Sequence, residues 1–431
     1  MKFVSTSGRS PAVDLRTALL QGLAPDGGLY LPSPLEPASA VTIAGLKHRP
    51  FAEVARTIGQ HVLGGALEPG TLDRLTAEAF DFPVPVVPLG PRTYVLELFH
   101  GPTLAFKDFG ARFMARLLSE LNGVGDRPLT ILVATSGDTG GAVAHAFHRV
   151  PGTEVVVLYP HGRVSATQER QFTTLGDNVR ALAVDGVFDD CQRLVKEAFG
   201  DAELNGALRL TSANSINIGR LVAQIFYYFF ARSELPGADA EVVVSVPSGN
   251  FGNLTAGLMA KRLGLPVTRF VAATNRNDVV PAYLECGRFE PRASTPTISS
   301  AMDVGNPSNL ARITALYGGD VDRLKRDVIG SAHTDDATRA CIADVAGRYG
   351  YVLDPHSAVG YLGLQRALAE HPSATGVFLA TAHPAKFAAI VEAVIGRPVS
   401  IPQRLAVCLG REPVVERIGP DLRELRDVLL V

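Results

Sequence analysis

The sequence has few cysteines and no excess of charge of either sign, and each shortage excludes a class of protein. The four cysteines, Cys191, Cys286, Cys341 and Cys408, are far apart and form no C-x-x-C pair. They indicate buried thiols in a reducing compartment, the cytoplasm, rather than a disulfide framework. The 41 basic and 43 acidic side chains nearly cancel. Because no block of like charges occurs, nucleic acid and anionic membranes are not expected as partners.

Long apolar runs are also missing. The most apolar stretch, residues 221–231, is far shorter than the ~20 residues that cross a bilayer, and we predict a buried helix there. The N-terminus reaches polar residues at once, without an apolar core of signal-peptide length. With 431 residues, the chain is too long for one ordinary core, so we expect two or three domains.

Periodicity predicts an α/β protein with an N-terminal unit of its own, residues 1–82. In that unit we expect a short strand at residues 3–4 and helices at 14–22, 51–62 and 72–80. Four prolines between residues 83 and 91 mark a domain boundary. Beyond it we expect strands at 93–98, 129–135, 154–159, 181–184, 241–246, 269–273 and 376–381, and helices at 142–147, 168–175, 189–199 and 254–263, with another starting near residue 385. Continuous apolar strands that alternate with helices are typical of parallel sheets covered on both faces.

Lys107 is the candidate nucleophile. It lies between the apolar residues 104–106 and Phe109, and apolar surroundings favour a neutral amine. Such an amine forms a Schiff base with a carbonyl compound, of which pyridoxal phosphate is the commonest in metabolism. The alternative is a lysine that reaches solvent from the first turn of an amphipathic helix.

A first glycine-rich loop follows the buried strand 129–135. It consists of Thr135, Ser136, Gly137, Asp138 and Thr139. Backbone N–H groups and hydroxyls at the start of a helix bind a carboxylate or phosphate well. The alternative is ordinary N-capping of the next helix.

A second loop follows strand 241–246 and precedes a helix; its residues are Ser248, Gly249, Asn250, Phe251, Gly252 and Asn253. The loop matches neither the Walker A motif nor G-x-G-x-x-G. Small residues let the backbone come close to an anion, so we expect a cradle for a cofactor phosphate that is never transferred. An ordinary strand-to-helix turn is the alternative.

Further polar candidates lie at the end of the last strand and before the apolar helix. Thr381 is placed to bond a pyridine nitrogen through a neutral hydroxyl, whereas His383 is read as a residue at the start of a helix. A second anion is expected at Ser212, Asn214, Asn217 and Arg220, because a guanidinium suits phosphate or carboxylate. A surface arginine is the commoner case.

Four motifs together resemble the threonine synthase family. In order they are H-G-P-T-L-A-F-K-D-F, S-G-D-T-G, P-S-G-N-F-G-N and T-A-H-P-A-K-F, and G-L-A-P-D-G-G-L-Y-L-P at 22–32 looks like that family's N-terminal domain. The resemblance implies an α/β enzyme of fold-type II, similar to the tryptophan synthase β chain, with pyridoxal 5′-phosphate as cofactor. Residues 1–82 would form the N-terminal domain. Residues 83–431 would form two parallel-sheet subdomains with the cofactor in the cleft between them.

The resemblance also implies residue roles and a reaction. Lys107 would carry the cofactor and shuttle protons, Gly249 to Asn253 would hold its phosphate, and Thr381 would face the pyridine nitrogen. The loop Ser136 to Thr139 would take the substrate carboxylate. The reaction is a lyase step from O-phospho-L-homoserine and water to L-threonine and phosphate, the last of threonine biosynthesis.

Two positions depart from the family pattern. Asp138 stands where many fold-type II relatives have asparagine, and Ser7 stands where the family has arginine. A serine/threonine dehydratase, or another β-eliminating enzyme with the same cofactor, is the alternative function. We expect no metal ion at the site, and either a monomer or a homodimer.

Overall fold

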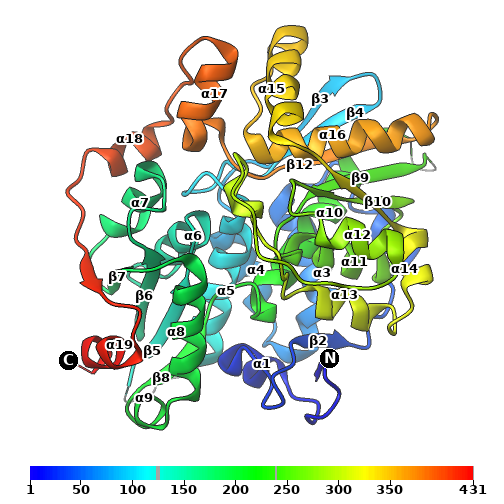
Figure 1. The fold of residues 1–431 in the computed structure, drawn as a ribbon. Coiled ribbons are helices and arrows are strands. Elements are labelled where there is room, and N and C mark those ends of the chain that lie inside the picture. Colours follow the sequence, from blue (N-terminus) through cyan, green and yellow to red (C-terminus); the bar gives the residue numbers. More distant parts are fainter. Residues whose placement is uncertain (123–126, 238–239, 431) are drawn as a thin grey trace.

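The computed structural model describes residues 1–122, 127–237 and 240–430, which form one small and two large sheets among many helices (Figure 1). The N-terminal strand β1 (Lys2–Ser5) pairs antiparallel with β2 (Tyr30–Ser33). The helices that follow are α1 (Leu15–Gln21), α2 (Ala40–Ala44), α3 (Phe51–Leu63), η1 (Gly64–Ala66) and α4 (Thr71–Ala79). The strand and the three helices predicted for this region are confirmed.

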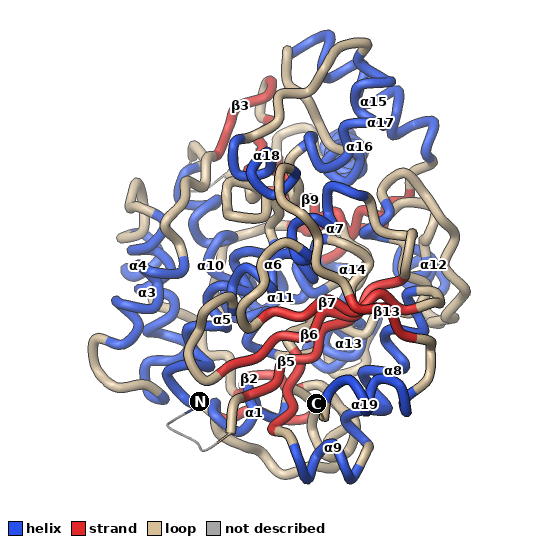
Figure 2. Tube along the Cα trace, turned by 90° about the vertical axis from the view of Figure 1, so that its left-hand side faces the viewer, coloured by secondary structure: helices blue, strands red, loops and turns tan. Residues whose placement is uncertain are grey.

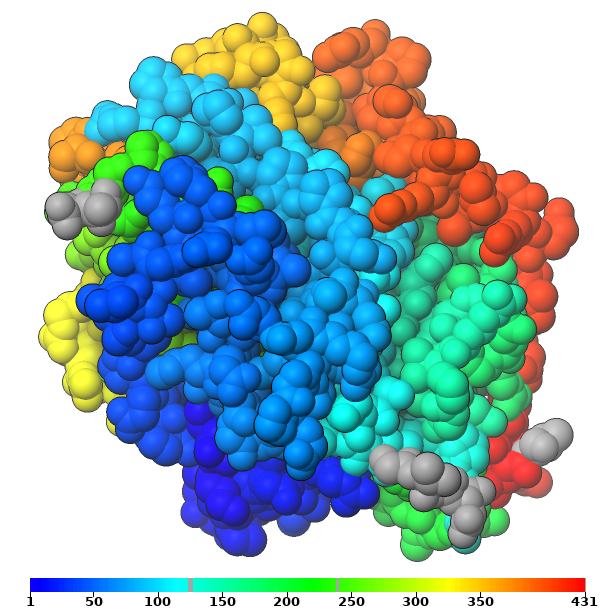
Figure 3. Space-filling view, turned by 180° about the vertical axis from the view of Figure 1, so that it is seen from behind, coloured from blue at the N-terminus to red at the C-terminus, as the bar shows by residue number. Residues whose placement is uncertain are grey.

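These N-terminal residues pack directly on the helices beyond the proline-rich segment. Figure 3 shows them in blue, spread over the back of the molecule beside the cyan residues that follow. The ring centroids of Phe51 and Phe109 lie 5.3 Å apart, edge to face, and those of Phe80 and Phe113 lie 6.0 Å apart. Aromatic pairs in this range contribute beyond the area that they bury. The N-terminal core is therefore continuous with the helix that begins at Lys107.

The larger sheet has the strand order β11-β10-β9-β12-β4-β3. Its strands are β3 (Val86–Gly90), β4 (Thr93–Glu97), β9 (Val242–Pro247), β10 (Arg269–Thr274), β11 (Val328–Ala332) and β12 (Thr375–Ala380). All neighbours are parallel except β3 and β4. The proline-rich segment 83–91, which we interpreted only as a domain boundary, therefore contains strand β3. Pro88 is compatible with β3 because β3 is at the edge of the sheet, where a missing N–H breaks no ladder.

The smaller sheet is parallel throughout and has the order β13-β7-β6-β5-β8. Its strands are β5 (Leu129–Ala134), β6 (Thr153–Pro160), β7 (Val179–Val184), β8 (Arg209–Ser212) and β13 (Glu416–Ile418). The predicted strands β5, β6 and β7 are confirmed. The edge strands β8 and β13 were not predicted, because they are short and carry arginine and glutamate in place of an apolar run.

Both faces of the sheets are buried, as the continuous apolar strands predict. In β5, Ile131 and Val133 join a core cluster with α5 and α10, whereas Leu132 and Ala134 join another with α8. Figure 2 shows α6 and α7 above strands β5 to β7, with α8 and α19 below them. Successive strand residues point to opposite faces, so each strand supplies two cores.

The remaining helices cover these sheets and connect them. They are α5 (Lys107–Asn122), α6 (Asp138–Phe147), α7 (Ala166–Thr173), α8 (Phe188–Gly200), α9 (Ala202–Ala207), α10 (Ile218–Glu234), α11 (Gly252–Arg262), α12 (Val279–Cys286), η2 (Ser300–Met302), α13 (Leu310–Leu316), α14 (Val321–Asp327), α15 (Asp335–Tyr349), α16 (Pro355–Glu370), η3 (Pro384–Phe387), α17 (Ala388–Ile395), α18 (Gln403–Leu409) and α19 (Leu422–Leu429). Helix α10 is the predicted apolar helix and is almost entirely buried. Among the described residues, no helix combines the length and apolarity of a membrane span.

One cysteine departs from the sequence-based interpretation. Cys191, Cys341 and Cys408 are buried free thiols, but Cys286 is exposed. It is the last residue of α12, where the chain turns at the surface. The expectation of four buried thiols is therefore wrong at this position.

Candidate active site

The predicted site residues gather at the carboxyl ends of strands in both sheets. The first glycine-rich loop follows β5 and the second follows β9. At β5 and at β9 the strand order reverses direction, and parallel α/β sheets open their ligand crevices at such points. Thr381 follows β12 directly, and Lys107 begins α5 after β4.

Lys107 is tied to the end of β12 through its own loop. The backbone N–H of Phe106 donates to the carbonyl of Thr381 at 2.8 Å, and that of His383 donates to Leu104 at 3.0 Å. Leu104 has φ 59°, a conformation that branched residues rarely adopt and that persists only where the surroundings impose it. The two sequence motifs are therefore one structural unit.

The amine of Lys107 has no hydrogen-bond partner among the described residues. Lys107 is half-buried, and loss of hydration lowers its pKa from 10.5 to about 8. The nearby charges of Lys386 and Arg220 lower this pKa further, whereas Asp138 opposes them. Burial penalises the charged form of a lysine, so a substantial fraction of the amine is neutral near physiological pH.

The loop before Lys107 is fixed by a buried carboxylate. Asp108 accepts from the backbone N–H of Thr103 at 2.8 Å and from its hydroxyl at 2.7 Å. Burial raises the pKa of Asp108 to about 6, against the lowering effect of these hydrogen bonds. The contact locks the turn from which the Lys107 side chain projects.

The loop after β5 has free N–H groups at the start of α6. The hydroxyl of Thr135 accepts from Gly137 and Gly140 and so shapes the turn. Gly137 has φ 144°, and a Cβ there would lie 2.6 Å from the Gln168 side chain, so only glycine fits. No acceptor in the described structure pairs with the backbone N–H of Ser136, Asp138 or Thr139. The loop therefore offers donors to an anion, although the Thr135 hydroxyl is already used.

The carboxylate of Asp138 is not free. Lys386 donates to its Oδ1 at 2.7 Å and Gln168 donates to the same atom at 2.8 Å. Lys386 and Lys107 together hold the pKa of Asp138 well below its usual range, despite its burial. Asp138 is therefore an anion with Lys386 as its counter-ion. This ion pair explains how an acidic side chain is accommodated where many fold-type II relatives have asparagine.

The loop after β9 forms a cradle of unpaired N–H groups. Among the described residues, no backbone acceptor pairs with the amides of residues 249–253, which end at the start of α11. A Cβ on Gly249 would lie 2.7 Å from the Cα of Met302, so the backbone comes close to its neighbour there. Free amides together with a helix N-terminus make an anion site.

Side chains of this loop hold its shape. Ser248 donates to the Oδ1 of Asn253 at 2.9 Å, and the Asn253 amide donates to the carbonyl of Pro247. Asn250 donates to the hydroxyl of Ser215 at 2.7 Å and accepts from the N–H of Ser308 at 2.6 Å. Since these side chains are engaged, the backbone is the part of the loop that is available to a ligand.

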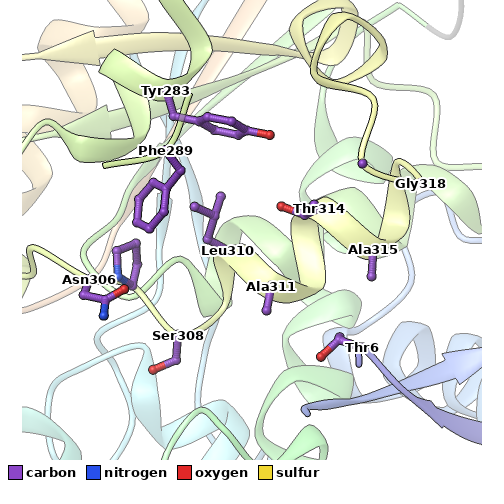
Figure 4. A pocket seen from close by; sticks show the side chains of 12 residues that line it. Thr6, Tyr283, Phe289, Asn306, Ser308, Leu310, Ala311, Thr314, Ala315 and Gly318 are labelled. Carbon is purple, nitrogen blue, oxygen red and sulfur yellow. The ribbon is translucent and has the colours of Figure 1, made fainter. Parts of the chain in front are cut away.

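An open hollow of about 730 Å³ lies beside the Ser308 contact (Figure 4). Its walls include Thr6, Tyr283, Ser308 and Leu310, and none of the described residues that line it is charged. Lys107 and both glycine-rich loops lie outside its lining. The hollow therefore lacks the groups that the chemistry requires.

Thr381 and His383 differ in their environment. Thr381 is buried as a residue, and its hydroxyl has no partner among the described residues. His383 is the N-cap of η3, and its Nδ1 accepts from the N–H of Ala385 at 3.1 Å. The prediction that His383 starts a helix is confirmed, whereas Thr381 keeps a free donor and acceptor.

Not all of the four residues predicted to bind a second anion have hydrogen-bond donors to spare. Asn217 uses both amide N–H bonds on the carbonyls of Leu19 and Ser212, and its oxygen caps α10 at Gly219. It has no donor left for an anion, so its predicted role does not fit. Its side chain was taken for a ligand because the Leu19 contact is invisible in the local sequence.

The other three residues, Ser212, Asn214 and Arg220, can still form hydrogen bonds to an anion. Asn214 donates one N–H to the carbonyl of Ala134 at 2.9 Å and is half-buried. Ser212 bonds weakly to Asn214, at 3.4 Å. Arg220 is buried and donates to the carbonyls of Ala213 at 2.6 Å and Lys107 at 3.4 Å, but its Nε has no partner among the residues that the structure describes. A buried guanidinium N–H without an acceptor is costly, and an anionic ligand would satisfy it.

Lys386 was not singled out by the sequence, although it belongs to the motif of Thr381. Its signal was present in T-A-H-P-A-K-F, which places a second lysine five residues after Thr381. The sequence does not indicate the partner of Lys386, because Asp138 begins α6, which follows a strand of the smaller sheet.

Comparisons with known proteins agree with this geometry. The family model described as the threonine synthase N terminus matches residues 2–80, a pyridoxal-phosphate dependent enzyme model matches 83–382, and a threonine synthase C-terminal model matches 357–429. The threonine synthase of Escherichia coli K12 is 46% identical over 431 residues, which cover 100% of this chain and 99% of that protein. These matches extend over all of the structural parts described above.

Solved structures give the same result. The pyridoxal-phosphate-bound threonine synthase from Brucella melitensis superposes with a TM-score of 0.94 at 38% identity, covering 100% of this chain and 99% of that chain. Threonine deaminase isoform 2 from Solanum lycopersicum has a TM-score of 0.57 at 15% identity, covering 86% and 98%. The second likeness shows the fold alone. The predicted α/β fold of type II is confirmed.

The described residues fit pyridoxal 5′-phosphate, the cofactor of this fold. They provide an unpaired amine at Lys107, a cradle of free amides at residues 249–253, and an unpaired hydroxyl at Thr381. These three features match the aldehyde, the phosphate and the ring nitrogen of the cofactor in chemistry. Because the family models and the full-length relatives agree with this donor set, the chain belongs to the threonine synthase family of pyridoxal-phosphate-dependent lyases.

Proposed function

We propose that this chain converts O-phospho-L-homoserine and water into L-threonine and phosphate, with Lys107 as the residue that moves the protons. One observation supports the assignment of roles: the Lys107 amine lies close enough to the start of α6 to feel the charge of Asp138. Helix α11, the second helix that starts with unpaired N–H groups, follows β9, which pairs with β12. A substrate with a carboxylate, bound beside a cofactor with a phosphate, requires two such anion sites.

Three elements would hold the cofactor. Lys107 would hold it covalently, the amides of residues 249–253 would bind its phosphate, and Thr381 would bond its ring nitrogen. When bound, pyridoxal 5′-phosphate supplies an electron sink that makes the Cα proton of an amino acid removable. The loop after β9 contains no lysine, which suits a phosphate that is held and never transferred.

Lys107 is suited to carry protons at Cα and Cβ of the substrate. A general base works best with a pKa near the operating pH, and burial lowers that of Lys107 to about 8. The turn that carries it is locked by the Asp108 contact with Thr103. A fixed turn lets the amine return a proton to Cα and deliver the proton taken from Cβ to Cγ, which becomes the methyl group of threonine while water adds at Cβ.

The substrate carboxylate is assigned to the start of α6. The backbone N–H groups of Asp138 and Thr139, and the hydroxyl of the exposed Ser136, are the donors. The Asp138 side chain would repel a second carboxylate, but the Lys386 ammonium at 2.7 Å compensates its charge. The loop can therefore bind an anion despite its acidic residue.

The leaving phosphate is assigned to Arg220, with Asn214 and Ser212 as neutral donors. The unpartnered Nε of Arg220 supports this role. Preorganised donors at developing negative charge are typically worth about 10²- to 10³-fold in rate. Water is required only after phosphate has left, so we expect the two sheet units of residues 83–431 to close over the substrate.

A dehydratase with the same cofactor would need no second phosphate site. The two functions are separated by an assay of the purified protein for threonine and phosphate from O-phospho-L-homoserine, run beside an assay for ammonia from threonine. Threonine and phosphate in equal amounts support the proposal. Ammonia release without phosphate release would reject it.

A further inference from the structure

The buried ion pair between Lys386 and Asp138 has no role in the proton transfers proposed above. The Lys386 side chain is 0% exposed and that of Asp138 is 4% exposed, with 2.7 Å between Nζ and Oδ1. Removing two charges from water is expensive, and such a pair is weak evidence for stability alone. Its position beside the nucleophile suggests a function.

The pair connects three segments of the site. Lys386 lies in η3, which follows β12 of the larger sheet. Asp138 begins α6, which follows β5 of the smaller sheet. The Lys386 ammonium also donates to the carbonyl of Thr103 at 2.8 Å, and Thr103 holds Asp108. One ammonium thus fixes the turn before Lys107 against the loop of the other sheet.

Asp138 interacts electrostatically with both lysines, yet only one of them bonds to it. The charges of Lys386 and Lys107 both act on its carboxylate. Its Oδ1 accepts from Lys386 and Gln168, whereas the Lys107 amine has no hydrogen-bond partner in the part of the chain that the structure describes. A buried carboxylate without a counter-ion is strongly unfavourable. If Lys386 lost its charge, Lys107 would be the remaining ammonium close to Asp138.

The other ionisable groups described around Lys107 and Lys386 do not supply the negative charge that Asp138 supplies to Lys107. Burial lowers the pKa of His145 to about 4 and also lowers that of His383, so both rings are neutral. Burial raises the pKa of the Cys408 thiol. Asp108 is bonded to Thr103, and Arg220 is a cation that disfavours charge on Lys107. Asp138 is therefore the acid that favours a charged Lys107.

We propose that Lys386 is a positioning residue for Lys107: it keeps Asp138 as its own counter-ion and so leaves the Lys107 amine unpaired and neutral enough to attack the cofactor aldehyde. This inference depends on the proposed role of Lys107. It adds that the neutral state of Lys107 depends on a second lysine, contributed by another segment of the chain.

The test measures how attachment of pyridoxal 5′-phosphate to the apoprotein depends on pH, followed by absorbance of the bound cofactor. In Lys386→Gln, Asp138 pairs with Lys107, so the midpoint for attachment moves upward by about one to three pH units. In Asp138→Asn, the midpoint moves downward, because the acid that favours the charged amine is gone. The double variant Lys386→Gln/Asp138→Asn restores a midpoint close to that of the native chain.

A merely structural role would not give opposite shifts in the two single variants. Lys261→Gln is the matched control, since Lys261 pairs with Asp327 at 2.8 Å at the far end of α11, and its midpoint stays native. Equal midpoints in all variants, or shifts of the same sign in both single variants, would overturn the inference. If Lys386→Gln does not fold, the downward shift in Asp138→Asn decides the question.

Failure of the inference and failure of the proposed function give different results. If Lys107→Ala still takes up the cofactor covalently, the role of Lys107 is wrong and the inference fails with it. If Lys107→Ala abolishes attachment while Lys386→Gln leaves the midpoint unchanged, the proposed function stands and only the positioning role is rejected.

Discussion

The backbone N–H of Phe106 donates to the carbonyl of Thr381 at 2.8 Å, which joins the turn before Lys107 to the end of the central strand β12. Two motifs that are far apart in the sequence thereby meet at one point. The proposed nucleophile, Lys107, and the residue proposed for the ring nitrogen, Thr381, are positioned by the same contact.

Removing the Lys107 amine is expected to abolish cofactor attachment and to reduce turnover by about 10²- to 10⁴-fold or more, because the residue serves as general base as well as attachment point. The measurement is mass spectrometry after borohydride treatment of Lys107→Ala, together with the rate of threonine formation. Lys261→Ala is the control and should behave as the native chain. A borohydride-fixed cofactor in Lys107→Ala at native turnover would show that another residue is the nucleophile.

Adding a methyl group in the phosphate cradle is expected to weaken cofactor binding. In Gly249→Ala the new Cβ would lie 2.7 Å from the Cα of Met302, which forces the loop out of shape. Overpacking costs about 1 to 3 kcal/mol, so the dissociation constant should rise about 5- to 150-fold. Gly206→Ala, where a Cβ meets nothing within 4 Å, is the matched control. Unchanged affinity in Gly249→Ala would place the cradle elsewhere.

Arg220 and Asn217 should differ in what they affect. Arg220→Ala is expected to lower kcat/KM for O-phospho-L-homoserine by about 10²- to 10³-fold, since the leaving phosphate loses its cation. Asn217→Ala should instead destabilise the fold by about 1 to 2 kcal/mol, because it removes the cap of α10 and its bond to Leu19. Steady-state kinetics and urea unfolding of both variants make the comparison. A native rate in Arg220→Ala would move the leaving-group site away from α10.

Stability of the apoprotein should depend on pH through Lys107. The folded pKa, about 8, is below the ordinary value of 10.5, so between these values the unfolded chain binds one more proton than the folded chain. Stability due to this group therefore rises as pH increases from 8 to 10.5, by about 1 to 3 kcal/mol. The measurement is the free energy of unfolding of the native chain and of Lys107→Met at pH 7 and 10. A difference between the two chains that does not change with pH would contradict the lowered pKa.

The sequence predicted well whatever depends on local pattern. The strands β5, β6, β9 and β12 are continuous apolar runs, and both glycine-rich loops follow such runs. The environment of Lys107 could be inferred for the same reason, since its apolar neighbours are adjacent in the chain. These features require no knowledge of the tertiary fold.

Several of the failures depend on contacts between distant segments. The edge strand β3 contains Pro88, which local propensity disfavours and an edge position permits. The amide of Asn217 donates to the carbonyl of Leu19. The charge of Asp138 is compensated by Lys386, which follows a strand of the other sheet. Nothing in the residues around these positions indicates such partners. For the same reason, the departure at Asp138 could be noticed in the sequence but explained only by the structure.

We propose above all that this site uses Lys107 to make threonine from a phosphorylated substrate. The most direct test incubates the purified protein and its Lys107→Ala variant with pyridoxal 5′-phosphate and O-phospho-L-homoserine, and quantifies threonine and phosphate by chromatography. We expect the native chain to release both products in equal amounts and the variant to release neither. Phosphate without threonine from the native chain, or threonine at the native rate from the variant, would contradict the account.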